Sequence, residues 1–196
     1  MWARRTGRGA AVALGLAGLG AWAARPAVEP QAGLTAKPPT RAVAGSPAPA
    51  WANTSWLNTD GPVRLEALRG RVVLLNFWVF TCGNCTRTLP SLRKFDSTYR
   101  ARGLTIIGIH TPEFPPYAGE HDRSNVARAL EGHEVRYPIA QDNDRATWRL
   151  YDIRYWPSFV LIDKQGRIRN TGYGEFHVDD QWHRQWTARI EALLAE

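Results

Sequence analysis

The residues best suited to chemistry are two cysteines separated by two residues, in the sequence Cys82-Gly83-Asn84-Cys85. They are the only cysteines among the 196 residues, so the chain has no framework of structural disulfides. A spacing of two residues brings both sulfurs within one turn, and thiol–disulfide exchange requires one of them to attack as a thiolate. A zinc site needs four ligands, and the five histidines offer no paired-ligand spacing. The pattern therefore predicts a redox-active disulfide that works without a metal or another cofactor.

The sequence around the cysteines predicts how they are positioned. Residues Val72–Phe80 are apolar apart from Asn76, which is typical of a strand buried on both faces. After the cysteines, apolar residues recur with helical spacing from Leu89 to Tyr99. Cys82 is then expected at the first turn of a helix, where free N–H groups and the helix dipole stabilise a thiolate. We expect Cys82 to be the attacking cysteine and Cys85 to be the resolving one.

Further strands and helices are expected along the rest of the chain. Leu104–His110 predicts a second buried strand, parallel to the first because a helix crosses between them. Ser158–Asp163 predicts a third strand, paired antiparallel with residues 167–171 through a tight turn. The turn signal Asp60-Gly61-Pro62 predicts a short hairpin before the first core strand. Helices are expected at residues 124–130, 143–151 and 178–194. The fold class is α/β, with a central mixed sheet and helices on both faces.

The N-terminal residues have the composition of an export signal. Residues 1–9 carry three arginines, and Ala10–Ala24 contains no charge. This pattern predicts a signal peptide or an N-terminal membrane anchor over residues 1–24. Residues 25–50 are rich in Pro and Ala and are expected to be a linker, followed by one domain over residues 51–196. Export agrees with a disulfide site, because disulfides persist outside the reducing cytosol.

Net charge gives weak evidence about partners. The formal charge is +7, but Arg4, Arg5 and Arg8 lie in the expected signal segment. Without these three charges the remainder carries +4, and no basic helix or patch interleaved with aromatic residues is left. We therefore expect no nucleic-acid partner.

Several motifs resemble the thioredoxin-like superfamily. The features are Phe77-Trp78, the Cys82/Cys85 pair, and Pro90 five residues after the second cysteine. The stretch NFWVFTCGNCTRTLP looks most like the thioredoxin domain of DipZ-type cytochrome c biogenesis proteins, and is more distantly similar to the TlpA/ResA group. Further similar stretches are GIHTPEF, YPIAQDND and YDIRYWPSFVLID, so the resemblance covers Trp51 to His177. It implies a thioredoxin fold with an N-terminal hairpin extension and a helical insertion.

The resemblance also implies further site residues. Pro157 occupies the position of the family's cis-proline, and Trp156 before it would offer backbone groups to an incoming peptide. The alternative is an ordinary trans proline that opens a strand. Asn76 stands where thioredoxin has a buried Asp that relays a proton, and Asn cannot ionise. Glu113 is our candidate for that relay, because the C-terminal ends of adjacent parallel strands share one edge. The alternative for Glu113 is a solvated loop acid.

The resemblance implies a periplasmic or extracytoplasmic thiol–disulfide oxidoreductase, and we expect it to be a monomer. It would act on protein thiols and disulfides, with apocytochrome c among its targets. DipZ-type proteins also carry a multispanning membrane part, which is absent from this sequence, so electrons are expected from a separate membrane protein.

Two alternatives belong to other functional classes. One is a copper-delivery protein of thioredoxin fold, but that group resembles Cys-x-x-x-Cys with a distant His, and this chain has one residue fewer. The other is a thiol peroxidase, which requires a Thr three residues before its cysteine, whereas Thr81 adjoins Cys82.

Overall fold

The computed structural model describes residues 43–196, so the expected signal segment and most of the expected linker lie outside it. The strands are β1 (Trp56–Leu57), β2 (Val72–Trp78), β3 (Leu104–His110), β4 (Ile139–Gln141), β5 (Ser158–Ile162) and β6 (Ile168–Tyr173). The helices are α1 (Gly83–Tyr99), α2 (Arg123–Gly132), α3 (Ala146–Leu150) and α4 (Gln181–Ala195), with 3-10 turns η1 (Leu65–Leu68), η2 (Arg100–Arg102) and η3 (Pro116–Ala118). Within residues 43–196, no helix combines the length and the apolar content that crossing a membrane requires.

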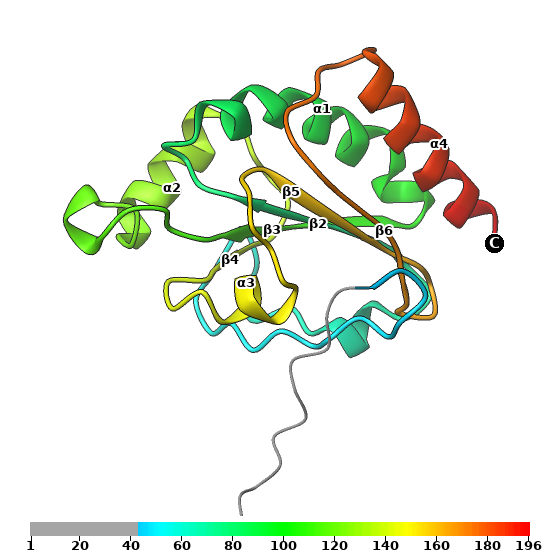
Figure 1. Ribbon diagram of the computed structural model, residues 1–196, viewed down its shortest axis with the longest axis horizontal. Helices are drawn as coiled ribbons and strands as arrows, with labels where there is room; N and C mark the ends of the chain where they lie inside the picture. Colours follow the sequence, from blue (N-terminus) through cyan, green and yellow to red (C-terminus); the bar gives the residue numbers. More distant parts are fainter. Residues whose placement is uncertain (1–42) are drawn as a thin grey trace, which may run out of the picture. The chain divides into compact units, whose positions relative to one another are not determined.

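The strands form one mixed sheet in the order β1-β4-β3-β2-β5-β6 (Figure 1). β2 pairs in parallel with β3, as its crossover helix α1 predicts, and antiparallel with β5. All seven residues of β2 are buried, because the central strand is covered on both faces. Trp78 at the end of β2 is paired with His110 at the end of β3. These two parallel strands therefore end at the same edge of the sheet.

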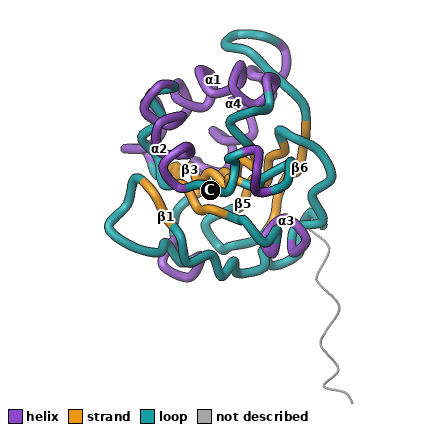
Figure 2. Tube along the Cα trace, turned by 90° about the vertical axis from the view of Figure 1, so that its left-hand side faces the viewer, coloured by secondary structure: helices purple, strands orange, loops and turns teal. Residues whose placement is uncertain are grey.

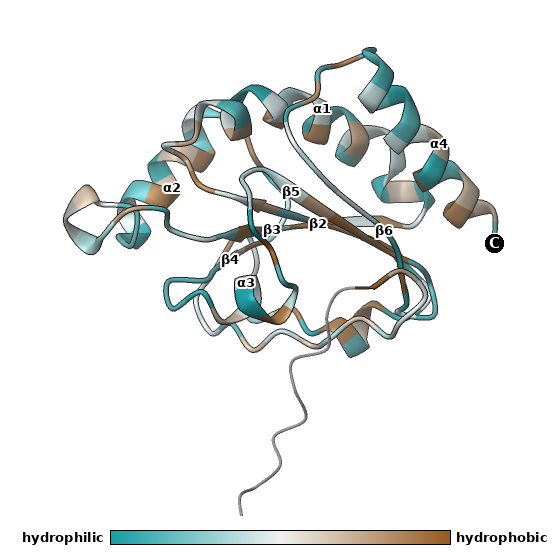
Figure 3. Ribbon diagram, viewed as in Figure 1, coloured by the Kyte–Doolittle hydropathy of each residue, from teal (hydrophilic) through white to brown (hydrophobic). Residues whose placement is uncertain are grey.

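Helices cover both faces of the sheet, as the sequence predicts (Figure 1, Figure 2). Alternate residues of β2 point to opposite sides: Leu74 packs with the apolar residues of α1 and α4, and Leu75 packs with those of α3 and η1. Figure 3 shows hydrophobic residues along β2 and β5 in the centre of the sheet and a mixture of hydrophobic and hydrophilic residues along the helices. The α/β class expected from the sequence, a central mixed sheet between helices, is confirmed. The start of α1 therefore lies at the C-terminal end of β2, beside the end of β3.

The expected N-terminal hairpin is wrong in its pairing. β1 pairs antiparallel with β4, with Trp56 opposite Ala140, and the residues after the turn enter η1 instead of a return strand. The side chain of Asn58 explains this, because its amide donates to the carbonyls of Val135 and Tyr137 at 2.9 and 3.2 Å. These bonds hold the chain against the segment that leads into β4. A two-residue strand gains more from an existing sheet edge than from an isolated hairpin.

The packed domain begins before the expected boundary at residue 51. The Gly45 N–H donates to the Ile168 carbonyl at 2.6 Å, and the Ala48 N–H donates to the Gly166 carbonyl at 2.9 Å. The Tyr151 hydroxyl donates to the Pro49 carbonyl at 2.6 Å. The last residues of the expected linker are therefore part of the folded domain.

Candidate active site

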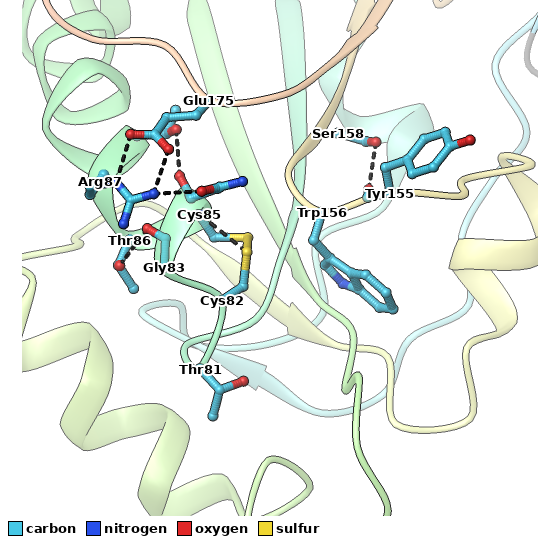
Figure 4. The surroundings of a disulfide bond; sticks show 12 residues. Thr81, Cys82, Gly83, Cys85, Thr86, Arg87, Tyr155, Trp156, Ser158 and Glu175 are labelled. Atoms are coloured by element: carbon cyan, nitrogen blue, oxygen red, sulfur yellow. Dashed lines mark hydrogen bonds and ion pairs between the residues drawn. A yellow bond between two sulfur atoms is a disulfide. The ribbon is translucent and has the colours of Figure 1, made fainter.

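The two cysteines lie where β2 passes into α1 (Figure 4). Cys82 is the N-cap of α1, and its sulfur accepts the Cys85 N–H at 3.2 Å. A disulfide joins Cys82 and Cys85, whose Cα atoms are 5.2 Å apart. Cys82 is half-buried, whereas Cys85 is only 1% exposed. Cys82 is thus the more exposed of the two, and the attacking and resolving roles stay predictions.

The loop before β5 lies beside the disulfide. Its Trp156–Pro157 peptide bond is cis, so the conformation predicted for Pro157 is confirmed. Ser158 then begins β5, and its hydroxyl donates to the Tyr155 carbonyl at 2.7 Å. Trp156 and Cys82 both pack against the cluster of apolar residues under α1. The fold therefore brings together the Cys82–Cys85 pair and the Trp156–Pro157 segment, which are far apart in the sequence.

The ring of Trp156 is held from three sides. Its indole N–H donates to the Thr111 carbonyl at 3.1 Å, and its ring stacks on Trp148 with centroids 4.1 Å apart. The guanidinium carbon of Arg145 lies 5.2 Å from the ring centroid, within cation–π range. Arg145 in turn donates to the Pro112 carbonyl at 2.7 Å. This packing fixes the side chain of Trp156, and its predicted role in offering backbone groups to a peptide stays a prediction.

A buried carboxylate that the sequence analysis missed lies at the same edge. The side chain of Glu113 is exposed, but its N–H and that of Phe114 both donate to one oxygen of Glu120 at 2.7 Å. Glu120 is 0% exposed, and its other oxygen accepts the hydroxyl of Thr81. Glu120 thus ties the residue before Cys82 to the loop after β3. Glu120 lies in an irregular segment, where no sequence periodicity predicts which acidic residue is buried. The relay predicted for Glu113 stays a prediction.

Replacing Glu120 by alanine is expected to lower the free energy of unfolding by about 2 kcal/mol, because three donors lose their acceptor. Glu120→Gln should cost less than about 1 kcal/mol, since its amide accepts the backbone N–H groups and donates to Thr81. Urea unfolding measures both. Glu113→Ala is the control and should change stability by less than about 0.5 kcal/mol, as for other exposed side chains. An equal loss from Glu113→Ala would contradict this view of the loop.

Two further polar residues near the site are neutral. Asn76 lies in β2 and is 1% exposed. His110 at the end of β3 is 0% exposed and packs between the rings of Trp78 and Phe80, at centroid distances of 5.3 and 5.5 Å. Burial lowers the pKa of His110 to about 3. Within the described residues, no group of three or more His, Cys, Asp or Glu could hold a metal ion.

Comparison with known proteins identifies a family and several similar proteins. The profile of the AhpC/TSA family matches residues 44–171. Protein DipZ of Mycobacterium tuberculosis is 46% identical over 136 residues, which cover 67% of this chain and 19% of DipZ. The chain therefore spans about a fifth of the length of that relative. Thiol-disulfide oxidoreductase YkuV of Bacillus subtilis is 26% identical over 143 residues, covering 72% of this chain and 89% of YkuV.

A solved structure supports the fold. The crystal structure of a thioredoxin-like superfamily protein superposes with a TM-score of 0.68 at 23% identity, covering 77% of this chain and 97% of the other. At this identity the similarity concerns the fold alone.

Proposed function

The chain belongs to the AhpC/TSA family. We propose that it is an exported thiol–disulfide oxidoreductase that reduces protein disulfides in the cell envelope through Cys82 and Cys85. One observation carries the proposal. Cys82 is the partly exposed N-cap of α1, and Cys85 is buried next to it. This arrangement supports an attacking role for the more exposed Cys82 and a resolving role, in an intramolecular step, for Cys85.

The reaction proceeds in two exchange steps. The thiolate of Cys82 attacks one sulfur of a substrate disulfide, which forms a mixed disulfide and releases the first substrate thiolate. The thiolate of Cys85 then attacks the sulfur of Cys82 and releases the second substrate thiolate. Two electrons pass to the substrate, and Cys82 and Cys85 are left as a disulfide. A dithiol donor must reduce this disulfide by the reverse sequence.

Trp156 and Pro157 would position the substrate. The segment lies beside the disulfide, and the ring of Trp156 is fixed by Trp148 and Thr111. An extended peptide could pair with the backbone of Trp156 as a short added strand. We further propose a membrane protein as the electron donor and the cysteines of apocytochrome c among the targets. The similarity to DipZ supports an extracytoplasmic location.

Reduction of insulin by the purified protein, with a chemical dithiol as donor, tests the proposal. Turnover that depends on both cysteines is expected, and its absence would reject the assignment. Peroxide consumption and binding of copper to the reduced protein are measured in parallel. Fast peroxide turnover or stoichiometric tight copper binding without insulin reduction would favour the corresponding alternative.

We expect the reduction potential of the pair to be more negative than about −160 mV. Stabilisation of the Cys82 thiolate at a helix end reaches about 2 kcal/mol, and about 30 mV corresponds to 1.4 kcal/mol for a two-electron couple. This shift cannot span the roughly 150 mV between thioredoxin and the strong oxidants. Equilibration of Cys82 and Cys85 against glutathione measures the potential. A value less negative than about −160 mV would contradict a reducing role.

A further inference from the structure

Arg87 connects the residues between the two cysteines to a distant acid (Figure 4). It lies one helical turn after Gly83 on α1. Its Nε and Nη2 donate to the two carboxylate oxygens of Glu175, each at 2.7 Å, across 88 residues of sequence. Nη2 also donates to the side-chain oxygen of Asn84 at 2.5 Å. The planar guanidinium therefore bridges the active-site dipeptide and the segment between β6 and α4.

The same guanidinium lies against Gly83. A Cβ atom on Gly83 would lie 3.1 Å from Nη1 of Arg87, closer than side chains ordinarily pack. Arg87 is held at this place by its hydrogen bonds to Glu175 and Asn84. The Gly83-Asn84 dipeptide thus makes room for the guanidinium and supplies an acceptor for it. These contacts place a permanent positive charge beside the residue that follows Cys82.

Glu175 places a negative charge at the same position. The side chain of Glu175 is 19% exposed, and it also accepts a contact from Nε2 of His177 at 2.8 Å. The hydrogen bond from Arg87 lowers the pKa of the Glu175 carboxyl, so the carboxylate stays ionised at neutral pH. A nearby cation favours a thiolate, and a nearby carboxylate disfavours it. A cation and a carboxylate beside the active-site turn therefore have opposite effects on a thiolate there.

We propose that Arg87 and Glu175 are positioning residues whose opposing charges set how readily Cys82 forms a thiolate, and so set the redox potential of the Cys82–Cys85 pair. This inference rests on the proposed function. Arg87 promotes the reduced, thiolate form, and Glu175 limits that effect. Asn84 accepts a hydrogen bond from Arg87, and Gly83 leaves space for its guanidinium, so both charges lie beside the turn between the cysteines.

Two single variants distinguish this role from a structural one. Glu175→Gln keeps an oxygen that can accept from Arg87 but leaves the cation uncompensated, whereas Arg87→Gln leaves the carboxylate uncompensated. At low ionic strength, the pKa of Cys82 should fall by about half a unit or more in Glu175→Gln and rise by a similar amount in Arg87→Gln. The ultraviolet absorbance of the thiolate in the reduced protein measures both. If the ion pair only stabilised the local structure, both variants would shift the pKa of Cys82 in the same direction.

The redox potential should follow the same signs. Glu175→Gln should make it less negative and Arg87→Gln more negative, because a stabilised thiolate favours the reduced form. The double variant should return close to the wild type. Arg87→Lys keeps the charge without the planar fork, so it should stay closer to the wild type than Arg87→Gln. High salt should reduce all of these shifts, since the pair is partly exposed.

A second ion pair on α1 provides the matched control. Arg100 pairs with Asp96 at the other end of the helix, and its side chain is 56% exposed, as is that of Arg87. Arg100→Gln and Asp96→Asn should leave the pKa of Cys82 unchanged. Repeating Glu175→Gln in a His177→Gln background removes the contribution of that histidine. The buried Glu120 is the same in every variant and cannot produce the difference.

The outcomes are separable from the test of the proposed function. Shifts of the same sign in Arg87→Gln and Glu175→Gln, or no shift in either, would overturn the inference even if the wild type reduces insulin. If the wild type fails to reduce insulin, the proposed function fails, while the titration of Cys82 still tests the charge pair. Should Arg87→Gln not fold, Glu175→Gln still decides, since a Cys82 pKa that stays unchanged or rises in that variant would overturn the inference.

Discussion

Replacing Cys85 by serine is expected to make the protein accumulate mixed disulfides through Cys82. The half-buried Cys82 still attacks a substrate, but the 1% exposed Cys85 is no longer there to resolve the product. Cys82→Ser removes the proposed attacking sulfur, so insulin reduction should be lost and little substrate should be trapped. Non-reducing electrophoresis and mass spectrometry of the adducts measure both effects.

The relative reactivity of the reduced thiols gives an independent check. Cys82 should react with iodoacetamide faster than Cys85 at mildly acidic pH, because the start of α1 stabilises its thiolate. The Cys82→Ser/Cys85→Ser double variant is the control and should form no adducts. Faster labelling of Cys85, or equal trapping by both single variants, would reverse or remove the roles assigned here.

Acid should destabilise the folded protein through His110. Burial holds the pKa of this imidazole at about 3, whereas the unfolded chain binds the proton at the ordinary value of about 6.5. The stability from keeping His110 neutral is therefore present above pH 6.5 and is lost as the pH falls towards 3. Between pH 7 and pH 4 the loss is about 3 kcal/mol. Urea unfolding across this range measures it.

His110→Phe removes the titration and keeps a flat ring between Trp78 and Phe80. The variant should lose much less stability between pH 7 and pH 4 than the wild type. His133 lies at the partly exposed end of α2, so His133→Gln is the matched control and should show the wild-type acid dependence. An identical acid dependence in His110→Phe would show that other groups control the stability at low pH.

The central strands, the helix between them and the position of the cysteines could be predicted from the sequence. The apolar run that became β2 is long and buried on both faces, so its pattern is strong. The crossover through α1 required β3 to lie parallel to it, and the structure confirms this pairing. Cys82 was expected at the first turn of α1 and is its N-cap. These features depend on local periodicity and on the order of elements, both of which one sequence contains.

Short and irregular segments were decided by tertiary contacts. The two residues Trp56 and Leu57 are too few to show which strand they pair with. In the structure β1 pairs with β4, and the Asn58 amide donates to the carbonyls of Val135 and Tyr137 beside it. The packed domain likewise includes residues 45–49, which form hydrogen bonds with Gly166, Ile168 and Tyr151. No local sequence pattern predicts these hydrogen bonds. Such pairings depend on which sheet edge is free after the core has formed.

Within the candidate site, the reactive residues could be read from the sequence but the charges around them could not. Glu113 and Glu120 are both acids after β3, and only the fold shows that Glu120 is the buried one, bonded to Thr81. Arg87 is one of many arginines in the chain, and its partner Glu175 lies 88 residues away. A contact between side chains on separate elements produces no periodic pattern in the sequence from which it could be predicted. The tertiary structure therefore decides which charges act on Cys82.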